Sequence, residues 1–279
     1  VSIFSSSQSG QPVNSNAASS LIYQDLKIDS LNLSDEDGFI IALPNNESKP
    51  YIDLILKHNP NTILVDISSD HRLDSDWEYR IPELSGPVSS TRISNPGCYA
   101  SAMQFMLAPL ITKLAGPVNL FGISGYSGAG ASPNPRNNKE LLKENIIPYS
   151  LVSHLHEREV QAHSYREVLF TPSVGDFFRG ILITGNFTLS EPMSSEDACD
   201  IFKNFYQDKD LIKVQDSVPN LQEVRESSVV IIGGFEVDIK INRLTFCCVL
   251  DNLLKGAATQ AIQNLNSAFG WNDNLGIIK

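Results

Sequence analysis

Hydrophobic residues follow three patterns along the chain, and the first predicts alternating strands and helices. Short apolar runs at 38–44 (GFIIALP) and 62–68 (TILVDIS) are typical of strands buried on both faces of a parallel sheet. Between them, 48–58 carries apolar residues three and four apart behind Ser48, which predicts a capped helix. This order predicts an α/β fold with a Rossmann-like doubly wound sheet, whose ligands bind at the carboxyl ends of the strands.

The second pattern begins after Pro96–Gly97, where β-branched, strand-like segments outnumber helices. Strands are expected at 118–126, 167–174, 181–189, 229–237 and 243–250. Helices are expected over 98–114, interrupted or kinked at Pro109, and over 195–207. A long segment rich in Gly, Pro and Asn, 127–148, is expected to be a loop. Many strands with few helices predict an α+β domain with a largely antiparallel sheet.

The third pattern is a broad apolar face over 251–269, which predicts a final helix. We expect this helix to pack back against the first domain. A chain of 279 residues is long enough for two unequal domains. We therefore predict one domain formed by 1–97 together with 250–279, and a second formed by 98–249.

Composition narrows the classes of function. The net charge of −11 and the isoelectric point near 4.9 argue against nucleic-acid binding. No apolar run reaches 18 residues, so no membrane-spanning helix is predicted. The four cysteines (Cys98, Cys199, Cys247 and Cys248) form no CxxC pair, which argues against a disulfide scaffold or a zinc site and fits a reducing compartment.

Cys98 is the strongest candidate for a catalytic residue. In NPGCYA it follows a Pro-Gly turn and begins a predicted helix. Unpaired N–H groups and the helix dipole at a helix N-terminus favour a thiolate, so we expect a lowered thiol pKa and selective alkylation near neutral pH. A thiolate is the species that attacks an acyl group. The competing interpretation is an inert buried cysteine, the ordinary state of a free Cys.

A second candidate site lies in HLHERE, 154–159. In an extended segment, residues two apart face the same side, so His154 and His156 are expected to point into one site. Histidine suits a step that moves a proton on and off a developing oxyanion, and Glu159 can orient one ring. Two alternatives stay open: a metal site completed by His71 or Glu159, and a pair of surface histidines.

Two further features carry weaker signals. The Gly-rich YSGAGASP, 126–133, follows a predicted strand and can bring backbone N–H groups close to an anion. Arg72 ends VDISSDHR at the expected crevice, where a guanidinium can clamp phosphate or carboxylate. A plain turn and a solvated arginine are the ordinary interpretations of these features taken alone.

Together the motifs resemble the N-acetyl-gamma-glutamyl-phosphate reductase family of the aspartate-semialdehyde dehydrogenase-like group. The matching segments, in the family's order, are ALPN, VDISSDHRL, NPGCYA, SGAG, PYSLVSHLHERE and NLLKGAATQAIQ. They extend from Ser5 to the C-terminus, and the HLHERE segment is most similar to the fungal branch. In that branch the reductase is made together with an acetylglutamate kinase and works in mitochondria.

The resemblance implies NADPH-dependent reduction of N-acetyl-γ-glutamyl phosphate to the semialdehyde, in arginine biosynthesis, through a thioacyl intermediate on Cys98. It implies His156 as the general acid/base and no metal. The implied substrate-binding residues are Arg72, His154, Arg158 and Glu159. The implied NADP-binding residues are Ser5, Ser7, Pro44, Ser127, Gly128, Ala129, Gly130 and Asn252. The implied partners are a second copy of the chain and an acetylglutamate kinase, and the implied location is the mitochondrial matrix, with the cytoplasm as the alternative.

The sequence departs from the family pattern in three places. No Gly-rich strand-turn-helix precedes Ser5, so part of the dinucleotide site is expected to be missing from this sequence. Ser101 replaces the usual Thr, and Met106 replaces a small residue and requires repacking. Ser7 stands where some members carry an Arg near the NADP 2′-phosphate, so the preference for NADP over NAD rests on the family alone.

Three other functions remain as alternatives. A Cys–His hydrolase would resolve the thioester with water and need no nicotinamide. A truncated, non-catalytic chain would fold, partner a kinase and bind no dinucleotide. An aspartate-semialdehyde dehydrogenase would do the same chemistry on a shorter, unacetylated substrate, and the His-x-His segment argues against it.

Overall fold

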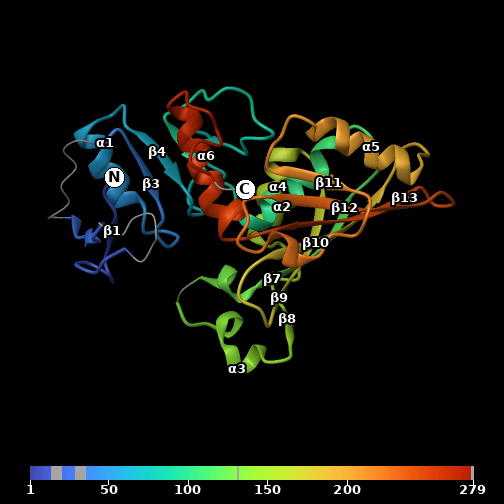
Figure 1. Ribbon diagram of the computed structural model, residues 1–279, viewed down its shortest axis with the longest axis horizontal. Coiled ribbons are helices and arrows are strands. Elements are labelled where there is room, and N and C mark those ends of the chain that lie inside the picture. The colour runs from blue at the N-terminus through green and yellow to red at the C-terminus, as the bar shows by residue number, and fades with distance from the viewer. Residues whose placement is uncertain (14–20, 29–35, 131, 278–279) are drawn as a thin grey trace.

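The computed structural model describes residues 1–13, 21–28, 36–130 and 132–277, and it has two lobes (Figure 1). The smaller lobe contains a four-stranded sheet and the larger a seven-stranded sheet. Helix α6 (Thr259–Ala268) lies between the lobes in Figure 1 and contacts β3 and β4 of the smaller sheet. No helix in the described ranges is both long and apolar enough to cross a membrane.

The smaller sheet is entirely parallel, with strand order β3-β4-β6-β5. Its elements are β3 (Gly38–Ile41), α1 (Lys49–His58), β4 (Ile63–Asp66), β5 (Glu78–Tyr79) and β6 (Arg92–Ser94). Two short strands, β1 (Phe4–Ser5) and β2 (Gln24–Asp25), pair in parallel beside it. The predicted βαβ unit is therefore confirmed, with α1 as its crossover helix.

Helices cover both faces of this sheet, as a doubly wound arrangement requires. Successive strand residues point to opposite faces. Leu64 packs with Ile52 and Ile55 of α1, whereas the next residue, Val65, packs with Ala261 of α6. Leu64, Val65 and Ala261 are fully buried. The final helix thus returns to the first sheet, as its apolar face predicts.

The larger sheet is mixed and has the order β11-β12-β13-β10-β7-β9-β8. Four of its six pairings are antiparallel, while β11–β12 and β7–β9 are parallel. Its strands are β7 (Val118–Gly125), β8 (Ile146–Pro148), β9 (Val168–Gly175), β10 (Ile181–Thr188), β11 (Ile212–Gln215), β12 (Val230–Asp238) and β13 (Arg243–Leu250). A largely antiparallel sheet is therefore confirmed.

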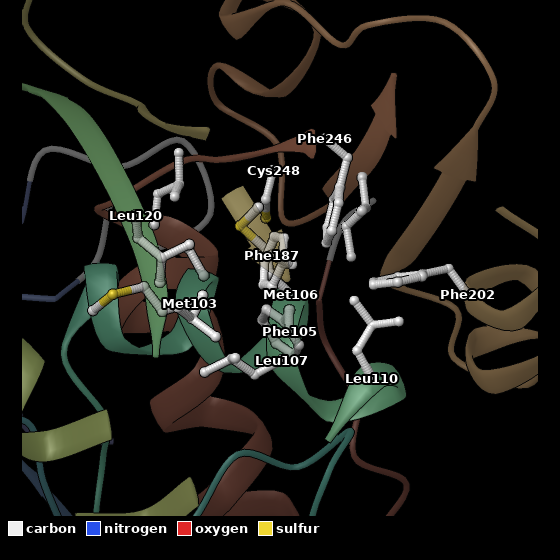
Figure 2. Close-up of a cluster of buried hydrophobic side chains, with 14 of the residues drawn as sticks. Met103, Phe105, Met106, Leu107, Leu110, Leu120, Phe187, Phe202, Phe246 and Cys248 are labelled. Carbon is white, nitrogen blue, oxygen red and sulfur yellow. The ribbon is translucent and has the colours of Figure 1, made fainter. Parts of the chain in front are cut away.

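The main core lies between this sheet and two helices, α2 (Cys98–Leu107) and α5 (Ser195–Tyr206) (Figure 2). Phe187 stacks on Phe246 at 4.7 Å, and Phe202 of α5 meets Phe246 edge-on at 4.9 Å. Burying each such side chain contributes about 1.5–3 kcal/mol. Met106 is fully buried in this cluster, so the departure from a small residue is accommodated in the core.

Local structure confirms the predicted interruption at Pro109 and differs from the prediction in two other places. Helix α2 ends at Leu107, and Pro109 lies in a separate 3₁₀ turn (Ala108–Leu110), because proline cannot continue an α-helical hydrogen-bond ladder. The expected loop 127–148 contains short elements: η3 (Tyr126–Ala129), η4 (Pro135–Asn137), α3 (Lys139–Leu142) and β8. The final helix begins with a π-helical turn, η6 (Leu254–Ala258), before α6.

Candidate active site

The Cys98 turn connects the end of β6 to the start of α2. Gly97 is the helix N-cap and Cys98 is the first helical residue, as predicted. Only glycine fits at position 97, because a Cβ there would lie 2.2 Å from His156 Nε2 and 2.5 Å from Arg72 Nη1. Position 256 is equally restricted, because a Cβ on Gly256 would lie 2.7 Å from Cys98 Cβ. The nucleophile candidate is therefore packed tightly between His156, Arg72 and the π-helical turn.

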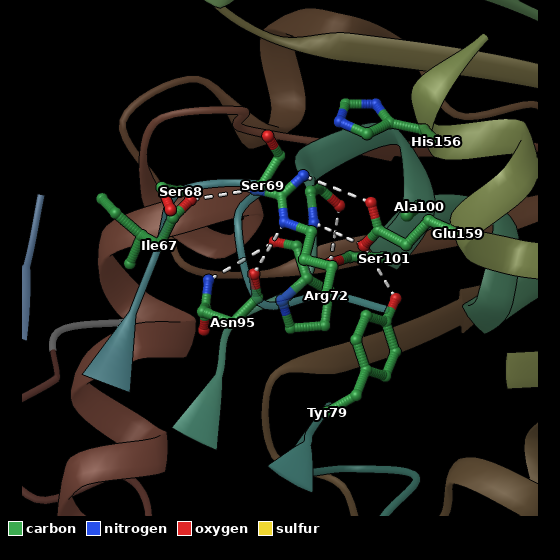
Figure 3. A network of polar contacts seen from close by, with 12 residues as sticks. Ile67, Ser68, Ser69, Arg72, Tyr79, Asn95, Ala100, Ser101, His156 and Glu159 are labelled. Carbon is green, nitrogen blue, oxygen red and sulfur yellow. Dashed lines mark hydrogen bonds and ion pairs between the residues drawn. The ribbon is translucent and has the colours of Figure 1, made fainter. Parts of the chain in front are cut away.

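Glu159 of helix α4 (Leu155–Ser164) holds this turn in place. Its fully buried carboxylate accepts hydrogen bonds from the Gly97 N–H (2.8 Å), the Tyr79 hydroxyl (2.9 Å) and Arg72 Nη1 (3.2 Å). Figure 3 shows the carboxylate surrounded by these groups, with His156 on the same helix. Glu159 therefore orients the residue before the cysteine and pairs with the neighbouring arginine.

Arg72 is held by three acceptors of the protein. Besides Glu159, its Nε donates to the Asn95 carbonyl (3.1 Å) and its Nη2 to the Ile67 carbonyl (2.9 Å). The residue is only 8% exposed. These contacts fix the position of a buried positive charge next to Cys98, at the carboxyl ends of β4 and β6, where sequence analysis expected it.

The prediction of an extended HLHERE segment was wrong, because α4 begins at Leu155 and places His156 in its first turn. His154 is the N-cap, and its Nδ1 accepts the His156 backbone N–H at 3.1 Å. The helix is further stabilised at its start by Glu157, whose side chain accepts the N–H of Ser153. An acidic residue three positions after a cap is a helix-start signal that could have revealed this.

The two imidazoles nevertheless meet at one site. Their ring centroids are 5.0 Å apart, and Tyr99, on the helix of the cysteine, lies about equally far from both, at 6.3 Å from His154 and 6.1 Å from His156. His154 Nδ1 acts as an acceptor, so the neutral ring carries its proton on Nε2. His156 Nδ1 is buried without a hydrogen-bond partner among the described residues.

Burial dominates the protonation states of these groups. It raises the pKa of the Cys98 thiol to about 11, although Arg72 and the N–H groups at the start of α2 lower it. The expected lowered pKa is therefore wrong for this state, because the loss of hydration outweighs the helix dipole. Burial also lowers the pKa of His156 well below its ordinary value, and lowers that of His154 to about 4. The site thus combines a neutral thiol with two neutral imidazoles.

Sequence reasoning missed Tyr149 and Arg136. The Tyr149 ring lies 5.5 Å from the His154 ring, and the Arg136 guanidinium lies over Tyr149, with Cζ 4.8 Å from the ring centroid. Burial raises the pKa of Tyr149 to about 12, with Cys98 adding to the increase and Arg136 opposing it. Tyr149 stands in the PYSLVSHLHERE motif and could have been found there. Arg136 lies in a segment with no periodic pattern.

The expected cofactor residues fall into two groups. Ser127 and Asn252 are joined by a hydrogen bond from Asn252 Nδ2 to Ser127 Oγ (2.9 Å), and a Cβ on Gly128 would lie 3.6 Å from the same nitrogen. Ala129 ends the same 3₁₀ turn, and Gly130 follows it with φ +81°. The second group lies in the smaller lobe: Ser5 ends β1, Ser7 is in the turn after it, and Pro44 follows β3. No contact between the two groups is observed in the described residues.

Two other expectations concern Arg158 and a metal. Arg158 is exposed on α4 and lowers the pKa of His154, behind the effects of burial and Arg136. In the described part of the chain, no three His, Cys, Asp or Glu side chains are grouped as metal ligands.

Comparison with known proteins adds to this geometry. Residues 1–90 match the semialdehyde dehydrogenase NAD binding domain, and residues 98–252 match the semialdehyde dehydrogenase dimerisation domain. In fold, the chain is similar to aspartate semialdehyde dehydrogenase II complexed with ASA from Vibrio cholerae, with a TM-score of 0.79 at 17% identity over 96% of this chain and 89% of that one. It is similarly related to aspartate semialdehyde dehydrogenase with NADP from Candida albicans (TM-score 0.73, 14% identity, 98% and 91% covered).

Sequence similarity is stronger to another group of proteins. The chain is 44% identical to N-acetyl-gamma-glutamyl-phosphate reductase of Xanthomonas axonopodis pv. citri over 92% of this chain and 82% of the relative. It is 43% identical to the protein of the same name from Xylella fastidiosa, over 95% of this chain and 81% of the relative. With both semialdehyde dehydrogenase domains matched and this identity extending over most of the chain, the chain belongs to the N-acetyl-gamma-glutamyl-phosphate reductase family.

Proposed function

We propose that this chain reduces N-acetyl-γ-glutamyl phosphate to N-acetylglutamate semialdehyde, with NADPH as the reductant, in arginine biosynthesis. As a member of its family it is an oxidoreductase of the semialdehyde dehydrogenase type. The observation that carries the proposal is the position of Cys98: it begins α2, next to the buried charge of Arg72, with the neutral His156 ring packed on the preceding Gly97.

Acylation begins with a proton transfer. The Cys98 thiol is protonated at rest, so His156 accepts its proton as sulfur attacks the carbonyl carbon of the acyl phosphate. A C–S bond forms, the bond from carbon to the phosphate oxygen breaks, and phosphate leaves with its bonding electron pair and takes a proton from solvent. Arg72 stabilises the negative charge that develops beside it, and Glu159 keeps Arg72 in place.

Reduction follows on the thioester. Bound NADPH supplies a hydride to the carbonyl carbon. The protonated His156 donates to the oxygen that becomes negative in this step, which produces a thiohemiacetal on Cys98. When the C–S bond breaks, the aldehyde leaves and the hydroxyl proton returns to the sulfur, so Cys98 is again a thiol and His156 is neutral.

The cofactor is assigned to the carboxyl-end crevice of the smaller sheet. Two observations support this proposal: nothing lies within 4 Å of a Cβ placed on Gly130, and Asn252 donates a hydrogen bond to Ser127 in the turn just before it. Backbone N–H groups of such a loop suit the anionic parts of a dinucleotide. Ser127, Gly128, Ala129, Gly130 and Asn252 would then hold the cofactor from the larger lobe. From the smaller lobe, Ser5, Ser7 and Pro44 would contact its other end.

The substrate-binding assignments are proposals as well. Arg72 would meet the phosphate of the acyl group, and His154 and the exposed Arg158, both at the start of α4, would contact the rest of the substrate. The buried and fully engaged Glu159 suits a positioning role better than direct contact with the substrate.

Two proposals concern organisation. The division into a dinucleotide-binding domain (1–97 and 250–279) and a catalytic domain (98–249) is supported by the packing of α6 on β3 and β4. A homo-oligomer formed through the larger sheet is supported by its dimerisation-domain match and by Phe121 and Leu169, which are 43% and 44% exposed on neighbouring strands.

Further proposals rest on the similarity of HLHERE to the fungal branch: an acetylglutamate kinase partner and a mitochondrial location. Co-purification of the tagged chain with the kinase tests the partner, and microscopy of the tagged chain in its own cells tests the location. A reductase that purifies without the kinase would contradict the first proposal. A reductase located in the cytoplasm would contradict the second.

The activity is tested in the reverse direction, with N-acetylglutamate semialdehyde, phosphate and NADP⁺, by following NADPH absorbance. We expect activity with this aldehyde that depends on phosphate, a loss on the order of 10⁴-fold or more in Cys98→Ser, and a strong loss in His156→Asn. Equal or faster turnover of aspartate semialdehyde would contradict the substrate assignment. Thioester hydrolysis that proceeds without any nicotinamide would favour the hydrolase alternative.

A further inference from the structure

The Arg136 side chain differs in its partners from two other arginines, Arg72 and Arg179. Arg72 pairs with Glu159, and Arg179 pairs with Asp251 at 2.7 Å. Among the described residues, no carboxylate forms an ion pair with Arg136. In a chain with 32 acidic and 21 basic side chains, a partly buried guanidinium without an acidic partner is available for an anion from outside.

The position of Arg136 connects it directly to the proposed active site. Its guanidinium lies over the Tyr149 ring at 4.8 Å, Tyr149 contacts His154 edge-on at 5.5 Å, and His154 contacts His156 at 5.0 Å. The series of contacts ends at Gly97, immediately before Cys98, where His156 Nε2 is packed. Arg136 therefore marks the far end of the site, with Arg72 at the end nearest the sulfur.

The loop that carries Arg136 is built to hold one shape. Asn134 and Asn137 form a reciprocal capping box around η4, and Pro135 occupies its first position. The Asn134 side chain donates to the Ala129 carbonyl (3.1 Å), and the Asn137 side chain donates to the Gly130 carbonyl (2.9 Å). These bonds tie the Arg136 turn to the Gly-rich segment assigned to the cofactor.

We propose that Arg136 binds the α-carboxylate of the substrate and so selects aldehydes that carry this carboxylate over aldehydes that lack it. This inference rests on the proposed function and adds to it a specificity residue that sequence reasoning did not find. The substrate carries an anion at each end. Arg72 faces the reacting acyl phosphate next to Cys98, and the second cation, beyond the two imidazoles, meets the carboxylate at the opposite end.

The carboxylate assignment is tested with a pair of aldehydes in the reverse reaction, with phosphate and NADP⁺ saturating. N-acetylglutamate semialdehyde carries the α-carboxylate, and 4-acetamidobutanal is the same molecule without it. For Arg136→Met we expect kcat/KM to fall about 10–100-fold with the first aldehyde, mainly through KM, because a charge-assisted hydrogen bond is lost. With 4-acetamidobutanal we expect no change. Arg136→Lys should recover part of the loss, because it keeps the charge but not the planar fork.

The matched control is Lys139→Met, which removes an exposed charge three residues further along the same loop and should leave both aldehydes unaffected. Equal losses with both aldehydes in Arg136→Met would overturn the inference while leaving the proposed function intact. So would a carboxylate-dependent loss in Arg158→Met with none in Arg136→Met. If the wild-type protein fails to turn over N-acetylglutamate semialdehyde at all, the proposed function itself fails.

Discussion

The two arginines of the site have opposite environments. Arg72 is 8% exposed and is held by one carboxylate and two backbone carbonyls of its own chain. Arg136 is partly exposed on a surface loop, stacks on Tyr149 and has no acidic partner among the described residues. The first arrangement fixes a charge where the reaction needs it, and the second leaves a charge available to a ligand. The chain therefore fixes the position of Arg72 by its own contacts, whereas the guanidinium of Arg136 keeps its capacity to pair with an incoming anion.

The largest effect is expected from breaking the Arg72 pair. Glu159→Gln leaves a buried guanidinium without its counter-charge, which costs about 3–5 kcal/mol when a buried pair loses one member. We expect a corresponding fall in the free energy of unfolding, measured by urea denaturation, and a fall in kcat. Unchanged stability would show that Arg72 is solvated rather than held by Glu159.

A second buried ion pair, between Lys255 and Glu83, sharpens the comparison with the Arg72–Glu159 pair. Neither of its members is proposed to take part in the reaction. Lys255 Nζ contacts both oxygens of Glu83 at 2.7 Å, and Gln263 bonds the same carboxylate. Glu83→Gln is expected to destabilise the fold by a similar amount, about 3–5 kcal/mol. Lys49→Met, which breaks an exposed pair with Asp53, should cost about 0.3–0.5 kcal/mol and serves as the control.

Acid titration provides an independent test of that pair. Burial opposes ionisation of Glu83, but Lys255 and Gln263 outweigh it, and the folded pKa of the carboxyl lies below 4.5. A depressed pKa stabilises the fold above the ordinary value, and the contribution disappears as pH falls through the folded pKa. We expect the stability difference between wild type and Glu83→Gln to shrink as pH falls below about 4.5. A difference independent of pH would contradict the assignment.

A smaller effect is expected at Cys98 itself. Its thiol pKa is raised to about 11 by burial, so iodoacetamide labelling of the unliganded protein should be slow at neutral pH and rise toward that value. The Glu159 carboxylate contributes to the increase, so Glu159→Gln should move the labelling midpoint to lower pH. Mass mapping of labelled Cys98 over a range of pH measures the midpoint in the wild type and its shift in Glu159→Gln. A wild-type midpoint below the ordinary thiol pKa would support the lowered pKa that the sequence predicted.

The smallest effect is expected from Arg136. Its partly exposed side chain forms no ion pair within the described residues, so Arg136→Met should change the free energy of unfolding by no more than about 0.5 kcal/mol. Thermal or urea denaturation measures this. A loss as large as that of Glu159→Gln would show that both arginines are structural and would remove the contrast between them.

Much of the architecture was predictable from local pattern. The apolar runs before Pro44 and around Val65 identified the parallel sheet, because a strand buried on both faces has no polar alternation. The Pro-Gly turn identified Cys98 as the first residue of a helix, because such a turn ends the extended stretch before it and a helical pattern begins directly after it. The HLHERE helix was missed because a short, polar segment has weak periodicity, and its start depends on a histidine cap that is outside the usual capping residues.

The sequence alone therefore determined the two domain types, the position of the candidate nucleophile and the family, since these depend on periodicity and on motifs that are contiguous in the chain. Tertiary structure decided the rest. The thiol pKa depends on how completely water is excluded around Cys98, which no local pattern encodes. The pairing of Arg72 with Glu159, 87 residues apart, and the stacking of Arg136 on Tyr149 exist only because the segment after β4, helix α4 and the η4 loop converge. This convergence neutralises the charge of Arg72 and leaves the charge of Arg136 available to a substrate.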